Sequence, residues 1–137
     1  MIVLDTNVLS AAMHFEAPVV AWLDRQPRTS VWTTAISMLE IRYGLLSMPT
    51  GRRRVERETA FARLLEDKLE RRVLPFDLDA AEQSAALMEA RRRAGRPGET
   101  RDTMIAGIAL AQRATLATRN IRHFEDLTVP VVDPWHA

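Results

Sequence analysis

The sequence predicts an α/β fold in which a mainly parallel central β-sheet is flanked by α-helices. Short apolar runs that fit buried strands alternate with longer segments that have the apolar spacing of helices. The predicted order is strand-helix-helix three times over, followed by strand, helix and strand, and this alternation favours parallel strand pairing. Because the 137 residues contain no linker, internal repeat or low-complexity stretch, we expect a single domain, residues 1–137.

The first predicted strand is the apolar run at residues 2–4. It stops at three residue types that favour caps and turns, namely Asp5, Thr6 and Asn7, so a helix is expected to start there. Pro18 fits the first turn of a second helix over residues 18–26, because proline lacks only an N–H that this turn leaves unpaired.

The second predicted strand is residues 30–33, and Thr34 can cap the helix that follows over residues 35–47. A break at Pro49 to Gly51 separates this helix from a long charged one over residues 52–71. The apolar stripe of the long helix consists of Phe61, Leu64, Leu65 and Leu69.

The third predicted strand, residues 73–76, leads into an Ala- and Leu-rich helix over residues 80–94 that stops at Gly95 and Pro97. Glu99 or Thr100 can open the next helix, which lasts to about residue 113. The last two predicted strands are residues 115–118 and 129–132.

The composition excludes several classes of protein. The 19 basic residues nearly balance the 18 acidic ones, and only Lys68 among the basic residues is lysine, so no strongly basic, histone-like character is present. The absence of cysteine excludes disulfide scaffolds, thiol catalysis and cysteine-ligated zinc. No segment suggests a signal peptide or a membrane span, and we therefore expect a cytoplasmic protein that does not bind membranes.

Two polar residues follow predicted strands at their carboxyl ends, where parallel α/β sheets bind ligands. Asp5 comes directly after the first strand, and Asn120 follows the strand that begins at Thr115. The two side chains are therefore expected to converge at one edge of the sheet. A helix N-cap is the simpler role for Asp5, and spacing alone slightly favours it.

Two further acidic residues lie on predicted helices. Asp102 shares a helix face with Ile105, Ala106 and Ala109, and a carboxylate on such an apolar face must be paired, hydrogen-bonded or metal-bound. Its alternative role is that of a first-turn aspartate favoured by the helix dipole. Glu40 lies in an apolar helix on a face of mixed polarity, where an ordinary half-exposed glutamate is equally compatible with the pattern.

Three carboxylates without cysteine, and without a histidine pair at ligand spacing, suit a hard cation such as Mg²⁺ or Mn²⁺. We assign no metal-binding role to His14, His123 or His136. The glycine-rich phosphate-binding and dinucleotide-binding motifs are absent, as is the nucleophile elbow of serine hydrolases.

Four ordered blocks of the sequence resemble the PIN domain family, and in particular the FitB-like branch of the VapC-type toxins. These blocks are MIVLDTNVLS, TTAISMLEIRYGL, RDTMIAGIALA and LATRNIRHFEDL, and the resemblance extends from Met1 to Trp135. GRRR, VLPFD and GRP are further segments similar to that branch. Each block is short and degenerate, whereas the ordered set is specific.

The resemblance implies a ribonuclease fold in which separated acids gather at one sheet edge and hold Mg²⁺ or Mn²⁺. Carried over by motif, the catalytic and metal-binding acids are Asp5, Glu40 and Asp102. The fourth catalytic position falls at Asn120, where other members carry aspartate, while Thr6 and Thr118 are expected to support the site by hydrogen bonds. The implied reaction is hydrolysis of RNA phosphodiester bonds by a water molecule that the metal activates. His123 stands where relatives carry an aspartate, which weakens the charge of the implied site.

The resemblance also implies partners: an RNA substrate, a small antitoxin with a DNA-binding module, and a second copy of the chain. Arg119 and Arg101 flank the implied site and are the expected RNA contacts. Two arginine clusters, at residues 52–57 and 91–96, fit solvated helix faces with neighbouring glutamates better than phosphate contacts. Antitoxin-binding surfaces and ordinary core positions are both compatible with Trp22, Phe61 and Leu65.

Two other functions are compatible with parts of the sequence. A PIN-like protein that binds RNA or a partner but cuts poorly would fit the departures at Asn120 and His123. A phosphate-transferring α/β protein, such as a phosphatase of the haloacid-dehalogenase type or a receiver domain, ranks last. Such a protein needs paired acids after the first strand and a later lysine, whereas the only lysine is Lys68 in a mid-chain helix.

Overall fold

The computed structural model describes all 137 residues, and it confirms the α/β class with a parallel central sheet. The sheet contains five strands in the order β3-β2-β1-β4-β5, and every neighbouring pair is parallel. The strands are β1 (Ile2–Leu4), β2 (Val31–Thr34), β3 (Val73–Leu74), β4 (Thr115–Ala117) and β5 (Val131–Val132).

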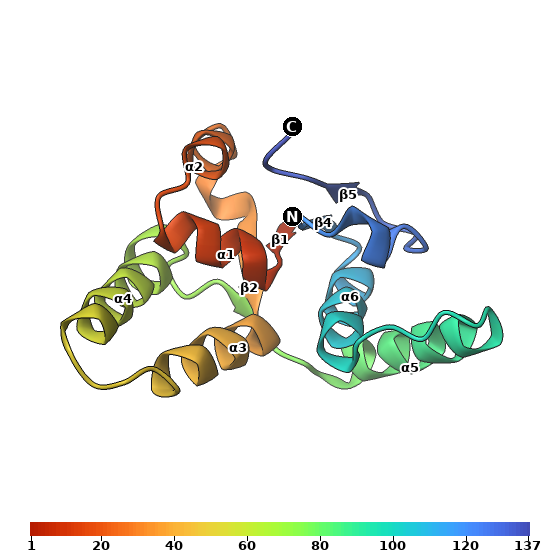
Figure 1. The fold of residues 1–137 in the computed structure, drawn as a ribbon. Coiled ribbons are helices and arrows are strands. Elements are labelled where there is room, and N and C mark those ends of the chain that lie inside the picture. The colour runs from red at the N-terminus through yellow and green to blue at the C-terminus, as the bar shows by residue number, and fades with distance from the viewer.

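Six α-helices surround the sheet (Figure 1). They are α1 (Thr6–Met13), α2 (Ala17–Asp24), α3 (Ala35–Leu46), α4 (Arg52–Arg63), α5 (Leu78–Arg93) and α6 (Thr100–Gln112). Shorter helical turns are η1 (Arg28–Ser30), η2 (Leu64–Lys68) and η3 (Ile121–Phe124). None of the helices is both long and apolar enough to cross a membrane.

Two apolar cores lie on the two faces of the sheet. Leu4 of β1 packs into a core with α1, α2 and α4, whereas its neighbour Val3 packs into a core with α5 and α6. Successive strand residues point to opposite faces, which explains why the buried strands are continuously apolar. Helix α3 contributes Ile36 to the core of α5 and α6 and Ile41 to the other core, so it joins the two layers.

The order of the strands creates a switch point between β1 and β4. From β1 the chain builds the sheet outward through β2 to β3, and it then returns to place β4 on the other side of β1. In open parallel sheets, ligands bind at the carboxyl ends of the strands at such a point. Asp5 follows β1 and Thr118 follows β4, so both residues lie there.

The long helix predicted over residues 52–71 is interrupted. Helix α4 ends at Arg63, and η2 continues it as a π-helical turn in which the Leu69 N–H donates to the Leu64 carbonyl over 2.9 Å. The turn buries both Leu64 and Leu69, and the left-handed residues Glu70 and Arg71 then end the helical segment. Apolar spacing does not reveal a π-turn, because the extra residue only shifts the stripe.

Other element boundaries differ from the predicted ones by a few residues. Strand β3 stops at Leu74, and β5 begins at Val131, because Pro75 and Pro130 have no N–H with which to continue a ladder. The helix expected between the last two strands is only the four-residue turn η3. Helix α5 begins at Leu78, two residues earlier than predicted, because the Asp77 carboxylate accepts the Ala80 N–H and caps the helix.

Candidate functional site

Asp5 lies at the centre of the candidate site, and it is also the N-cap of α1. Its carboxylate is 3% exposed and accepts the Thr6 N–H over 2.8 Å and the Thr118 hydroxyl over 2.7 Å. The Asp5 N–H donates to the Ala117 carbonyl, which ties β1 to β4 at this point. The capping role expected from spacing is therefore correct, and it coexists with a position at the switch point of the sheet.

The environment of Asp5 disfavours its charged form. Burial raises the pKa of its carboxyl from the ordinary value of 3.8 to about 6, although the hydrogen bonds from Thr118 and Thr6 oppose the rise. Repulsion from the carboxylates of Asp102 and Glu40 raises this pKa further. The three acids that the sequence predicts to gather thus share one electrostatic neighbourhood.

Glu40 is fixed to the same site by its neighbours. Its Oε1 accepts the Thr6 hydroxyl over 2.8 Å, and the Thr6 and Ser37 hydroxyl oxygens lie 2.9 Å apart. On its other side, Arg101 Nε lies 3.9 Å from Glu40 Oε2. Thr6 therefore connects α1 to α3, because its own N–H binds Asp5 while its hydroxyl binds Glu40.

Asp102 lies in the first turn of α6, where the Glu99 side chain caps the helix by accepting the Asp102 N–H over 2.9 Å. Partial burial raises the pKa of the Asp102 carboxyl, and the negative charge of Glu99 adds to this rise. His123 on η3 opposes it, because its Nδ1 lies 3.6 Å from Asp102 Oδ2. The residue that departs from the family pattern thus faces one of the site acids.

Thr118 and Asn7 connect the ends of β1 and β4. The Thr118 hydroxyl accepts the Asn120 N–H over 3.1 Å while it donates to Asp5. Asn7 Nδ2 lies 3.4 Å from both Asp5 Oδ2 and Thr118 Oγ1, and its Oδ1 accepts the Arg119 N–H over 3.2 Å. Asn120 contributes its backbone to this network, and its exposed side chain makes no hydrogen bond. Sequence reasoning missed Asn7 as a site residue, although it is the third residue of the Asp-Thr-Asn turn.

Four of the eight arginines in the two clusters pair with glutamates on their own helices. Arg52 and Arg54 bind Glu56 and Glu58, one turn further along α4. Arg92 and Arg93 both bind Glu89 on α5. The solvated-face interpretation of the clusters is therefore correct for these side chains.

Arg91 is different, because its side chain is only 6% exposed. It forms two hydrogen bonds with the Asp126 carboxylate, of 2.8 and 3.0 Å, and donates to the His123 carbonyl over 2.8 Å. It also donates to the Thr103 hydroxyl over 3.1 Å, next to Asp102. Arg91 thus joins α5, α6 and η3 beneath the candidate site, which the sequence did not indicate.

The alternative roles of the aromatic residues are also settled. Trp22 and Phe61 are buried in the core that contains α1, α2 and α4, and Leu65 is half-buried. The two aromatic side chains are therefore core residues and not an exposed antitoxin-binding surface.

The donor groups of the site are the oxygens of Asp5, Glu40 and Asp102, the donor type that Mg²⁺ and Mn²⁺ prefer. Burial, and to a smaller extent repulsion from Asp102 and Glu40, raises the pKa of the Asp5 carboxyl, and a divalent cation beside it would offset both effects. No three acidic or histidine side chains lie close enough together to form a complete ligand set. The residues fit a hard cation by their chemistry, with water completing its coordination.

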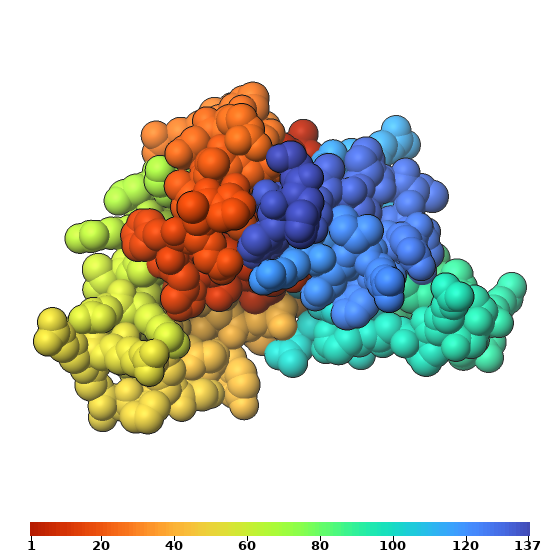
Figure 2. Space-filling model, turned by 45° about the horizontal axis from the view of Figure 1, so that its top comes forward, coloured from red at the N-terminus to blue at the C-terminus, as the bar shows by residue number.

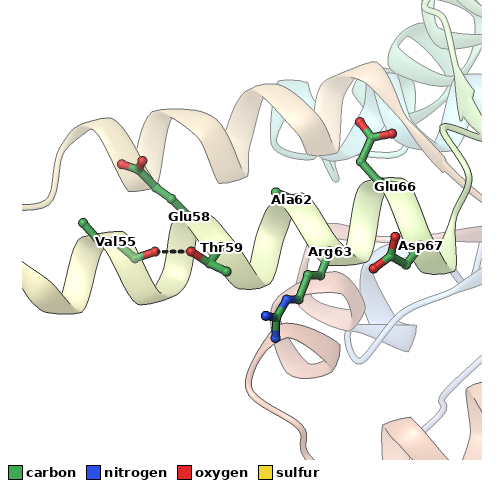
Figure 3. A pocket seen from close by; sticks show the side chains of 7 residues that line it. All are labelled: Val55, Glu58, Thr59, Ala62, Arg63, Glu66 and Asp67. Atoms are coloured by element: carbon green, nitrogen blue, oxygen red, sulfur yellow. Dashed lines mark hydrogen bonds between the residues drawn. The ribbon is translucent and has the colours of Figure 1, made fainter.

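Two hollows of the surface lie away from these acids. One, of about 460 Å³, is a shallow depression on the outer side of α4 and η2 (Figure 3). It is lined by Val55, Glu58, Thr59, Ala62, Arg63, Glu66 and Asp67. The other, of about 610 Å³, is a mainly apolar groove between α1, α2 and α4. Neither is lined by Asp5, Glu40 or Asp102.

Comparison with known proteins agrees with the fold. The PIN domain model matches residues 2–129. The chain is 40% identical to "VapC ribonuclease Y4jK" of Sinorhizobium fredii, over 98% of both chains, and 32% identical to "Toxin FitB" of Neisseria gonorrhoeae, over 99% of both. The solved structure of FitAB bound to a DNA fragment superposes on all of this chain and 97% of its own, with a TM-score of 0.86 at 31% identity. Since both the domain model and these relatives cover nearly the whole chain, the protein belongs to the PIN domain family.

Proposed function

We propose that residues 1–137 act as one VapC-type toxin domain, a Mg²⁺-dependent endoribonuclease of a toxin–antitoxin system. The observation that supports this proposal is that the charges of Glu40 and Asp102 both act on Asp5, which lies at the switch point of the sheet. The name of the relative that is 40% identical, a VapC ribonuclease, supports RNA as the substrate class.

Asp5 and Asp102 are the expected ligands of Mg²⁺, with Mn²⁺ as a substitute, directly or through water. Glu40 is the third acid of the proposed metal site, and Asn120 occupies the fourth catalytic position. When bound, the cation lowers the pKa of a water molecule and neutralises charge that develops on the phosphate.

Glu40 is the residue placed to handle the proton of the reaction. The Thr6 hydroxyl donates to its Oε1, while Arg101 Nε lies 3.9 Å from its Oε2. Glu40 Oε2 accepts a proton from the attacking water as the water oxygen forms a bond to phosphorus. The bond from phosphorus to the leaving oxygen breaks, and that oxygen keeps the electron pair and takes up a proton from solvent. Thr118 keeps the Asp5 carboxylate in its orientation throughout, while Arg101 and Arg119 contact the RNA backbone.

Metal removal tests the proposal. We expect the purified protein to cleave single-stranded RNA in Mg²⁺ or Mn²⁺ and to lose this activity completely in excess EDTA, because the acids alone cannot neutralise the developing phosphate charge. Activity should return when Mg²⁺ is added in excess of the chelator. Tight RNA binding without cleavage under every metal condition would contradict the proposal, and would favour a PIN-like protein that binds RNA but cuts poorly.

We propose that the apolar groove between α1, α2 and α4 receives a helix of the antitoxin. A solved structure that is 31% identical to this chain is FitAB bound to a DNA fragment, which supports a partner that also binds DNA. The groove is lined by apolar residues that include Leu4, Val20 and Leu64, and its rim carries both acids and bases. Phe15 at its edge is 79% exposed, and exposed apolar grooves of this kind bind the apolar face of an amphipathic helix.

Filling the groove tests this partner site. We expect Ala60→Trp, whose side chain enters the groove, to abolish co-purification of the co-expressed antitoxin from the neighbouring gene. Ala62→Trp, on the opposite side of α4, is the matched control and should retain the antitoxin (Figure 3). Equal retention by both variants would show that the antitoxin binds elsewhere.

We further propose that the protein is a homodimer in which α3 faces α3. Leu39, Tyr43 and Leu46 lie on one side of this helix and are 54%, 66% and 61% exposed. A stripe of large apolar side chains in water is typical of an interface. Helix α3 of the second copy would cover this apolar stripe, next to Glu40.

Light scattering coupled to size-exclusion chromatography checks the dimer. Tyr43→Glu should convert the dimer to a monomer, because the interface would then bury an unpaired charge. Val55→Glu, which places the same charge at an exposed apolar position of α4, should leave the dimer intact. A monomeric parent protein would refute the proposed interface.

A further inference from the structure

Arg119 lies over an aromatic ring beside the candidate site. Its guanidinium carbon lies 4.7 Å from the centre of the Trp135 ring, within the range of a cation–π contact. Arg119 follows Thr118, whose hydroxyl binds Asp5, and it precedes Asn120. The stacked pair therefore borders the site at the end of β4.

Both members of the pair are held in place independently. The Arg119 N–H donates to Asn7 Oδ1, and Asn7 also contacts Asp5. The Trp135 indole N–H donates to Glu16 Oε1 over 3.2 Å, and its backbone N–H donates to Asp133 Oδ1 over 2.9 Å. The C-terminal segment, dark blue in Figure 2, lies against the N-terminal helices in red and orange, in agreement with the Trp135–Glu16 contact.

The guanidinium of Arg119 has no ionic partner. No carboxylate lies within 4.0 Å of it, whereas Arg101 on the other side of the site pairs with both Glu40 and Glu99. Arg119 is exposed, and its guanidinium makes a cation–π contact with the ring of Trp135. The guanidinium thus lies over the indole ring, and it is exposed with its N–H donors unpaired.

We propose that the Arg119–Trp135 pair is a binding subsite for one nucleobase of single-stranded RNA, next to the phosphate that is cut; this rests on the proposed ribonuclease function. The base stacks on the open face of the guanidinium, which gives three planar layers of base, Arg119 and Trp135. Arginine planes and aromatic rings are the surfaces on which proteins stack unpaired RNA bases.

The geometry favours a base over a phosphate alone. A phosphate needs only charge, which an untethered arginine or lysine supplies as well. Stacking on Trp135 fixes the plane of the guanidinium before RNA arrives, and this reduces the ordering cost of binding a flat ligand. A base in a duplex is already stacked on its neighbours, so the subsite selects unpaired nucleotides.

Binding measurements on a variant that cannot cleave RNA distinguish a contact with the base from a contact with the phosphate. The Asp5→Asn protein serves as the common background, and fluorescence anisotropy follows a short fluorescein-labelled oligoadenylate and a matched abasic oligoribonucleotide. The further substitutions are Arg119→Lys, which keeps the charge but loses the plane, and Trp135→Leu, which removes the ring. Arg53→Ala removes an exposed arginine that has no ion pair and lies far away on α4, and it is the matched control.

We expect Arg119→Lys and Trp135→Leu each to weaken oligoadenylate binding about tenfold, and to change binding of the abasic RNA less than about twofold. Arg53→Ala should affect neither RNA by more than about twofold. Equal weakening for both RNAs would show a phosphate contact only, and unchanged binding in both variants would show no contact. Either result overturns the subsite while leaving Mg²⁺-dependent cleavage by the parent protein intact; a parent protein that does not cleave RNA would refute the ribonuclease function instead.

Discussion

We expect the Asp5→Asn protein to lose RNA cleavage and yet to be more stable than the parent protein at neutral pH when no divalent metal is present. The first effect follows from the central position of Asp5 among the site acids. Loss of the proposed metal ligand Asp5 should cost more than the 10–100-fold that is typical of residues that only support a metal ligand, and we therefore expect at least about 100-fold lower activity.

The gain in stability follows from the raised pKa of Asp5. This carboxyl titrates at about 6 in the folded protein and near 3.8 when unfolded, so the folded state binds the proton more tightly. The stability that this proton contributes is complete below about pH 3.8 and is lost as the pH rises through about 6. The loss amounts to at most about 3 kcal/mol at neutral pH, and a neutral asparagine avoids it.

Thermal unfolding in EDTA as a function of pH measures this effect. The midpoint for Asp5→Asn should exceed that of the parent at about pH 7.5, and the two should approach each other at about pH 4. Asp79→Asn, a change of an exposed carboxylate in the first turn of α5, is the control and should retain cleavage. An Asp5→Asn protein that folds and cuts RNA normally would refute the assignment of the site.

The sequence was sufficient to predict the sheet and the position of Asp5 at the end of its first strand, for physical reasons that are local. The apolar run at Ile2–Leu4 is too short for a helix and ends in a polar turn, so both β1 and the position of Asp5 could be inferred. The same argument places Thr118 at the end of β4. Both residues then meet because parallel strands present their carboxyl ends at one edge of the sheet.

The contacts between distant segments could not be predicted in this way. Trp135 and Arg119 are separated by a turn and a strand, and neither residue type carries a periodic signal. Arg91 stands in a run of three arginines, and only the packing of α5 against α6 distinguishes it from the two that follow. Three consecutive arginines cannot be told apart in a sequence, whereas in the structure one of them is buried and the other two are exposed.

The burial of Arg91 leads to the second large expected effect. Replacing it by methionine should destabilise the protein by about 2–4 kcal/mol, because the His123 carbonyl and the Thr103 hydroxyl would lose a buried donor and Asp126 its partner. Arg93→Met is the matched control on the same helix. Arg93 is exposed and paired only with Glu89, so its loss should cost less than about 1 kcal/mol.

Denaturant unfolding at several pH values isolates the contribution of the ion pair. The Arg91 guanidinium holds the pKa of the Asp126 carboxyl below its usual range, so the stabilisation that Asp126 provides is present above its ordinary pKa of 3.8 and is lost as the pH falls through the depressed value. The difference between parent and Arg91→Met should therefore shrink in acid, while the part that comes from His123 and Thr103 persists. Equal stability of Arg91→Met and Arg93→Met would contradict this role of Arg91. Arg91 donates to the His123 carbonyl and to the hydroxyl of Thr103, the residue after Asp102. Folded Arg91→Met protein should therefore also cut RNA more slowly than Arg93→Met, because His123 and the start of α6 are then no longer held together.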